Sequence, residues 1–288
     1  MGNNISRANV NNRGEEMNPE ILKIFEIYKS LKDANILYGN YDLVVGFILL
    51  FIKNEKSKSY DQIMSDFKNK YICSEMEIEK AHTKEERNGL SKVYDYIQNK
   101  DPEAEIGIAS EIRTIHRILW SDMPYPEAGG ELRTIQLYLP GSSVELSPPE
   151  NIIVDLCEMY DALEELEAIK AEVNNCNPEK VIEYIRKAVE LTCKLIKIHP
   201  FLDGNGRTMR AFLNYLFKRV KIPPTYIMPQ ENEEYRKAME LALLHGDYSK
   251  IEEFYLYKVC DSIAELNYGI VTADLECDNI SEEEKHRQ

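Results

Sequence analysis

The stretch IHPFLDGNGRTMR, residues 198–210, decides the fold prediction because it places polar residues between two apolar helical patterns. Before it, VIEYIRKAVELTCKLIKI repeats apolar residues three and four positions apart, and TMRAFLNYLF does the same after it. A buried loop needs partners for its amides and carbonyls, so a loop between two buried helices usually meets a ligand or a polar network. We therefore expect a polar binding site in this stretch.

The middle of this loop has the composition of a phosphate cradle. Gly204, Asn205 and Gly206 tolerate positive φ, so their successive N–H groups can point into one concavity. The helix expected to begin near Arg207 adds its unpaired amides and the positive end of its dipole. Arg207 and Arg210 are three positions apart and can reach phosphate oxygens from one side.

Two further residues of the loop add a metal ligand and a base. The carboxylate of Asp203 would repel a bound anion unless a divalent cation such as Mg²⁺ lay between them. His199 precedes Pro200, which favours the end of the helix there, and its imidazole can act as a general base. Taken singly, a helix-end histidine, a GNG turn and paired arginines are usually structural, but their concentration in one loop favours a site.

Composition limits the class of protein. The 288 residues, 43% of them hydrophobic, can form one sizeable core with a smaller helical appendage. The formal charge of −15 repels phosphate backbones, so nucleic acid is not expected as a partner. The six cysteines form no CxxC pair, which favours reduced thiols in a cytoplasmic protein over zinc sites or disulfides.

Membrane attachment has weak support in the sequence. The run LVVGFILLFI, residues 43–52, is about half of the roughly 20 residues that span a bilayer, so it predicts a buried helix. No secretion signal opens the chain. The first residues, MGNNIS, match the N-myristoylation pattern at Gly2, and chance is the alternative for so short a pattern.

The pattern along the chain predicts a mostly α protein with one β-hairpin. Residues 1–18 are polar and are expected to form a disordered tail, and 271–288 an acidic disordered tail. Between them we expect an N-terminal helical region at 19–104 and a second helical domain at 105–270. The hairpin is expected between Pro124 and Pro149, where partial alternation is flanked by turn residues.

The segment HPFLDGNGRTMR, residues 199–210, resembles the Fic family signature H-P-F-x-(D/E)-G-N-G-R-x-x-R. The resemblance extends from roughly Glu105 to Leu266. Most Fic proteins transfer AMP from ATP to a hydroxyl group of a protein target, with Mg²⁺ or Mn²⁺ as cofactor. The resemblance therefore implies a protein adenylyltransferase with a mostly α Fic domain and one β-hairpin, the flap.

The resemblance also implies roles for individual residues. His199 would take the proton from a Tyr, Ser or Thr hydroxyl, Asp203 would bind the metal, and Arg207 would contact the outer phosphates. The anion hole would consist of Gly204, Asn205 and Gly206, with Arg210 beside it. The flap, about residues 132–138, would pair with the target backbone through Thr134, Ile135 and Gln136.

Many Fic proteins carry an inhibitory helix whose glutamate pairs with the second motif arginine. The segment AHTKEERNGLS, within residues 78–98, resembles this helix with Glu86 in the place of the glutamate, so we expect Glu86 to contact Arg210. His82 and Arg87 depart from the motif, and a charged solvated helix face is the alternative. In some family members this glutamate also assists AMP removal.

Nucleotide choice and assembly stay open in the sequence. Leu244 stands where family members often have an asparagine that contacts adenine, and Tyr235 is a second candidate for the base pocket. A donor of UMP, phosphocholine or phosphate is therefore an alternative to ATP. A non-catalytic helical interaction module is the alternative from another class, and a homodimer is common in the family.

Overall fold

The computed structural model describes the backbone of residues 41–286 and the side chains of residues 42–274. The predictions for residues 1–18, for residues 19–40 of the N-terminal helical region and for Gly2 lie outside these residues. The described helices are α2 (Tyr41–Asn54), α3 (Tyr60–Ile78), α4 (Lys84–Asn99), α5 (Ile108–Leu119), α6 (Ile152–Glu158), α7 (Tyr160–Asn174), α8 (Pro178–Ile198), α9 (Asn205–Arg219), α10 (Asn232–His245) and α11 (Ser249–His286). Short 3₁₀ turns cover Pro126–Ala128, Pro149–Asn151 and Pro229–Glu231. The prediction of a mostly α protein is confirmed.

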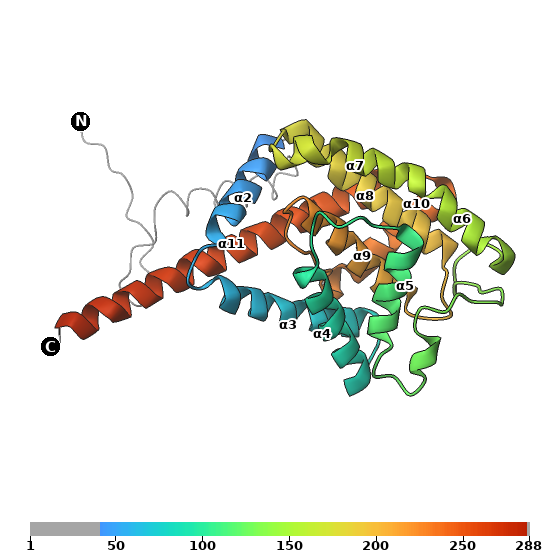
Figure 1. The fold of residues 1–288 in the computed structure, drawn as a ribbon, viewed down its shortest axis with the longest axis horizontal. Helices are drawn as coiled ribbons and strands as arrows, with labels where there is room; N and C mark the ends of the chain where they lie inside the picture. The colour runs from blue at the N-terminus through green and yellow to red at the C-terminus, as the bar shows by residue number, and fades with distance from the viewer. Residues whose placement is uncertain (1–40, 287–288) are drawn as a thin grey trace.

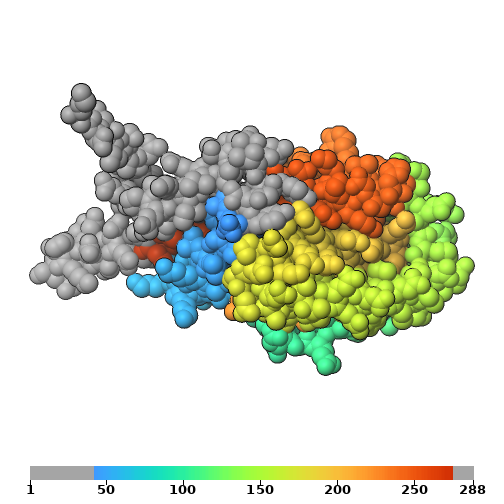
Figure 2. Space-filling view, turned by 90° about the horizontal axis from the view of Figure 1, so that it is seen from above, coloured from blue at the N-terminus to red at the C-terminus, as the bar shows by residue number. Residues whose placement is uncertain are grey.

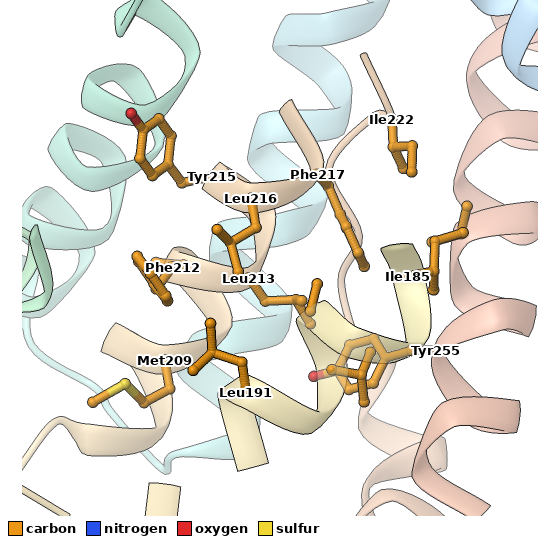
Figure 3. Close-up of a cluster of buried hydrophobic side chains, with 14 of the residues drawn as sticks. Ile185, Leu191, Met209, Phe212, Leu213, Tyr215, Leu216, Phe217, Ile222 and Tyr255 are labelled. Atoms are coloured by element: carbon orange, nitrogen blue, oxygen red, sulfur yellow. The ribbon is translucent and has the colours of Figure 1, made fainter. Parts of the chain in front are cut away.

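Helix α9 lies at the centre of the molecule and is buried on nearly every side. It packs against α4, α5 and α8, and α8 packs in turn against α2, α7, α10 and α11 (Figure 1). Apolar side chains of α8, α9 and α11 converge in this core, among them Leu191, Phe212 and Tyr255 (Figure 3). A helix that is buried all round has a fixed position, so the polar loop before α9 is held on a rigid support.

The apolar run at residues 43–52 forms a buried helix, as predicted, and this helix packs on the core. Val44, Phe47 and Ile48 of α2 are almost completely buried, and α2 lies against α8 and α11. From above, α2 shares one face of the molecule with α7 and the start of α8 (Figure 2). Within residues 41–286, no helix combines the length and the apolar character that a membrane span requires.

Helix α11 differs from the sequence prediction at its C-terminal end. A disordered tail was predicted for residues 271–288, whereas α11 continues to His286 and projects beyond the body of the molecule (Figure 1). No proline interrupts this segment, and Asp274 accepts hydrogen bonds from the hydroxyl of Ser57 at 2.6 Å and the N–H of Ser59 at 3.1 Å. These contacts fix the helix beyond Gly269.

The predicted β-hairpin is the one wrong element of the fold class. Residues 131–139 run without an assigned strand. Side chains replace the backbone ladder, because Arg133 Nη1 donates to the carbonyl of Ile135 at 2.8 Å and Gln136 Nε2 to that of Leu146 at 3.4 Å. The segment therefore forms an extended loop, which we call the flap loop (residues 131–147).

Candidate active site

The loop between α8 and α9 contains two residues with positive φ. His199 follows α8 in the left-handed conformation (φ 53°, ψ 57°), and Gly204, at φ 75°, precedes α9. The side chain of Asn205 accepts a hydrogen bond from the N–H of Phe201 at 2.9 Å and donates to its carbonyl at 2.8 Å. This side chain therefore shapes the loop, while the amides at the start of α9 lack acceptors within the helix.

Both the backbone conformation at position 204 and the side chains packed around it require a glycine there. Its positive φ favours glycine, and a Cβ at this position would lie 2.3 Å from Cζ3 of Trp120. The loop consequently passes against the indole ring more closely than any side chain would allow.

His116 of α5 supports the same loop from below, a role for which the sequence carries no local signal. Its ring stacks on Trp120 and Phe201, with centroid distances of 4.4 and 3.9 Å. Nδ1 accepts from the N–H of Gly130 at 2.7 Å, so Nε2 carries the proton and donates to the carbonyl of Asp203 at 3.0 Å. Burial lowers the pKa of His116 to about 4, which keeps the ring neutral at pH 7.

Arg133 links the flap loop to the residue expected to act as base. Its Nε donates to the carbonyl of His199 at 2.7 Å and Nη2 to that of Ile198 at 3.3 Å. Its own backbone N–H donates to the carbonyl of Pro200 at 2.9 Å, so one residue serves three successive carbonyls. Sequence reasoning missed Arg133 because an arginine beside the expected strand gives no sign that it is buried.

The imidazole of His199 faces a cavity and is partly buried. Nδ1 lies 3.3 Å from the carbonyl of Ile196. Burial lowers the pKa of His199 below its usual value, and the positive charge of Arg133 acts in the same direction, whereas Asp203 and Glu79 oppose the shift. A neutral imidazole at pH 7 can accept a proton.

Asp203 presents an exposed carboxylate beside the cradle. Its Oδ1 accepts from the N–H of Gly204 at 2.6 Å, and Oδ2 lies 3.5 Å from Nη2 of Arg207. The side chain is 74% exposed, so it can still take a further partner. A single hard oxygen ligand fits a divalent cation that takes its other ligands from phosphates and water. Among the described residues no group of three potential ligands gathers, so such an ion would depend on those other oxygens.

Arg210 is held by two glutamates of the α3 segment. Its Nε contacts both carboxylate oxygens of Glu75 at 2.9 and 3.0 Å, and Nη2 contacts Glu75 at 2.7 Å and Glu79 at 2.5 Å. Burial alone would raise the pKa of Glu79, but the charge and hydrogen bond of Arg210 lower it overall. The Glu79 carboxylate is therefore ionised at neutral pH.

The predicted contact between Glu86 and Arg210 is wrong. Glu86 lies 3.3 Å from Nη1 of Arg207 instead. Its other oxygen closes a capping box at the start of α4, where it accepts from the N–H groups of His82 and Thr83, each at 3.1 Å. Because the cap fixes Glu86 on α4, the partner of Arg210 comes from α3, which lies earlier in the chain.

A cavity of about 710 Å³ opens in front of the loop. Its lining includes Glu79, His199, Gly206, Tyr235, Arg236 and Leu243. The carboxylate of Glu79 lies directly over Gly206, since a Cβ on that glycine would be 2.7 Å from Oε1. An anionic group thus already lies against the start of α9.

The two candidates for the base pocket have different positions. Tyr235 lines the cavity, and its ring centroid lies 6.0 Å from the guanidinium carbon of Arg210. Leu243, rather than the predicted Leu244, contributes to the lining, and Leu244 packs against the hydrophobic core. Successive residues of a helix point in different directions, which explains why Leu243 meets this cavity and Leu244 packs against the core.

The exposed part of the flap loop lies where a partner can reach it. Thr134, Ile135 and Gln136 are all exposed, and 56% of the surface of Ile135 is accessible. Tyr138 nearby is 82% exposed. The loop thus presents exposed side chains and is joined to His199 through Arg133, without the strand geometry that was predicted.

Residues 107–217 match the model of the Fic/DOC family. The protein adenylyltransferase fic-1 of Caenorhabditis briggsae is 32% identical over 143 residues, which are 50% of this chain and 25% of the relative. Its Caenorhabditis elegans counterpart is 31% identical over 176 residues, 61% of this chain and 31% of the relative. The chain thus spans about a quarter to a third of the length of these relatives.

Solved structures share the fold. Fic-1 (aa134–508) from C. elegans superposes with a TM-score of 0.63 and 19% identity, covering 88% of this chain and 89% of that chain. A Fic domain containing signaling protein from Bacteroides thetaiotaomicron superposes with a TM-score of 0.55 and 19% identity, covering 81% and 94%. The likeness thus extends from the matched domain to the helices around it.

Proposed function

Because residues 107–217 match the model of the Fic/DOC family, we propose that this chain is a protein adenylyltransferase that moves AMP from ATP to a hydroxyl group of a target protein. The curated relatives carry this name, and the site residues of the present chain support the same chemistry. The observation that carries the proposal is an anion, the carboxylate of Glu79, lying over Gly206 in the cavity that His199 also lines.

The proposed reaction exchanges one phosphoryl bond for another. The target hydroxyl oxygen forms a bond to the α-phosphorus of ATP while the bond between that phosphorus and the bridging oxygen to the β-phosphate breaks, and pyrophosphate leaves. His199 accepts the hydroxyl proton, which its lowered pKa permits at neutral pH. The amides at the start of α9 stabilise the charge on the α-phosphate.

The metal and the outer phosphates have assigned partners in this proposal. Asp203 would hold Mg²⁺, which when bound offsets the negative charge of the phosphates. Arg207 lies beside Asp203 and near Trp120. Its guanidinium can bind phosphate oxygens there once its ion pair with Glu86 breaks. Positioning and charge stabilisation thus carry most of the catalysis.

The target protein would bind along the flap loop. Residues 134–136 are exposed and can pair with an extended peptide, and exposed Ile135 and Tyr138 can contact its side chains. Arg133 joins this loop to the backbone of His199, so a peptide bound there would present its hydroxyl next to the base.

We also propose that the resting enzyme is autoinhibited by Glu79 rather than by Glu86. The Glu79 carboxylate occupies the cradle and contacts Arg210, so a nucleotide phosphate cannot take the same place. Glu79 lies at the end of α3 and is followed by Lys80 at φ 54°, where the chain leaves the helix. A small shift of this segment would clear the cavity.

Transfer of differently labelled donors tests the function. Glu79→Gly protein is incubated with Mg²⁺ and ATP labelled in the α- or the γ-phosphate, together with protein extracts as the source of targets. Adenylyl transfer predicts covalent label from α-labelled ATP only, and His199→Ala in the same background should abolish it. Label from γ-labelled ATP would identify a kinase. Parallel incubations use labelled UTP and a labelled phosphocholine donor, and label from one of these alone would identify the alternative transferases.

A further inference from the structure

Glu75 is a second carboxylate on Arg210, and it is far more buried than Glu79. Its side chain is 1% exposed and binds both Nε and Nη2 of Arg210, whereas the side chain of Glu79 is 28% exposed. Glu79 lines the cavity, but the Glu75 carboxylate lies behind the guanidinium, within the core. Both glutamates thus bind the guanidinium of Arg210, Glu79 from the cavity, where it can move, and Glu75 from the core, where it is fixed.

Movement of Glu79 would leave the contact with Glu75 in place. Glu79 follows the last residue of α3, so local rearrangement of the connection to α4 can displace it. Glu75 lies within α3, where Tyr71 and Ile72 are also buried, and the hydroxyl of Ser74 donates to the carbonyl of Ile227. Separating Glu75 from Arg210 would require α3 itself to leave the core.

The charge around Arg210 follows from these positions. With both glutamates in place, the three side chains carry a net charge of −1, and after Glu79 moves away Arg210 and Glu75 form a neutral pair. An ion pair that is already satisfied offers little to a further anion, because an incoming phosphate would compete with a buried carboxylate for the same N–H groups.

We propose that Glu75 determines nucleotide specificity through Arg210, keeping this cation neutralised so that the terminal phosphate of a nucleoside triphosphate adds little affinity over the diphosphate. This inference rests on the proposed nucleotide site and deepens it. The cradle at the start of α9 then selects the phosphates nearest the nucleoside. ADP should accordingly be a strong competitor of ATP in this enzyme.

Calorimetric titration with ATP and with ADP, both in the presence of Mg²⁺, tests the proposal on the full chain. In Glu79→Gly, the two dissociation constants should agree within about threefold. In the double variant Glu75→Gln, Glu79→Gly, the neutral amide frees the charge of Arg210, and ATP should bind about tenfold or more tightly than ADP. The matched control is Glu77→Gln in the Glu79→Gly background, because Glu77 is an exposed residue of α3; its ratio should stay near that of Glu79→Gly.

The outcomes separate the two proposals. A preference for ATP above about threefold in Glu79→Gly itself would overturn the role of Glu75, and this result does not depend on the folding of the Glu75 variant. An unchanged ratio in a double variant that retains its helical circular dichroism and melts cooperatively would overturn it too. Failure of Glu79→Gly to bind either nucleotide would instead overturn the proposed nucleotide site, and the role of Glu75 with it.

Discussion

The guanidinium Nε of Arg133 donates a hydrogen bond to the carbonyl of His199 at 2.7 Å. His199 has positive φ, a conformation that costs a residue with a side chain roughly 1 kcal/mol or more unless its surroundings stabilise it. Arg133 supplies that stabilisation from the flap loop. The loop proposed to bind the target and the proposed base are therefore joined through one buried side chain.

Replacement of Arg133 by lysine should disturb this geometry. A single ammonium group cannot reach the carbonyls of Ile198, His199 and Ile135 together, so we expect a loss of about 3 kcal/mol in unfolding free energy. AMP transfer in the Glu79→Gly background should fall by about 100-fold, since a base displaced by 1 Å reacts slowly. Urea unfolding and initial rates measure the two effects. Arg117→Lys, at an exposed position of α5, should change neither, and equal activity of both variants would argue against a positioning role for Arg133.

The two candidate inhibitory glutamates should behave differently. Glu79→Gly removes the carboxylate from the cradle and should increase AMP incorporation at least about tenfold. Glu86→Ala removes the capping box of α4 and should lower stability by about 1 kcal/mol, while the Glu79 contact persists. Activation by Glu86→Ala without activation by Glu79→Gly would return the inhibitory role to Glu86. Thermal melts of the same samples measure the loss of stability caused by removing the capping box.

Two glycines with positive φ provide a matched test of the loop. Gly204→Ala would place a Cβ 2.3 Å from Trp120, whereas a Cβ at Gly141, with φ 74°, meets nothing within 4 Å. Gly141→Ala should therefore cost only the backbone term, about 1 kcal/mol, and Gly204→Ala at least about 2 kcal/mol more. Denaturant unfolding compares them, and equal costs would show that the loop can move away from the indole.

The pKa of His116 predicts a pH dependence of stability. Burial lowers it to about 4, below the unfolded value of 6.5, so the folded state binds fewer protons between these values. Stability is complete above pH 6.5 and decreases as pH falls toward 4, by about 2 kcal/mol at pH 5. His116→Gln should remove this part of the pH dependence. An identical pH profile of unfolding free energy in the wild type and the variant would contradict the assignment.

The activity of Glu79→Gly should depend on pH through His199. The base must be neutral to accept a proton, and its pKa lies below the usual value because of burial and Arg133. The rate should therefore be constant near pH 7 and decrease only as pH falls through a value below 6.5. Initial rates at saturating ATP measure this profile. A midpoint above 7 would indicate that another group titrates.

Local chemistry made the loop predictable from the sequence. Glycine spacing, the His-Pro pair and the flanking apolar helices depend on neighbours in the chain, and the structure has His199, Gly204 and Asn205 in one compact loop. The burial of α2 followed from its length and apolar composition in the same way.

Contacts between distant segments were harder to predict. Glu79 and Glu86 are both acidic residues upstream of the motif, and only the packing of α3 against α4 and of α4 against α9 decides which one meets Arg210. The strands of the hairpin were predicted from alternation, but Arg133 took the carbonyls that a ladder would use. The contact of Glu79 with Arg210 and that of Arg133 with Ser147 both join residues that are far apart in the sequence.

The intact mass of Glu79→Gly protein after incubation with ATP and Mg²⁺ tests the central proposal most directly, with candidate targets in the same mixture. Transfer by His199 predicts the gain of one AMP on the enzyme or a target, and no gain when Glu79→Gly is combined with His199→Ala. The same mass gain in the His199→Ala protein would contradict the assigned base. No gain with any nucleotide in a folded Glu79→Gly protein would contradict the enzymatic function itself.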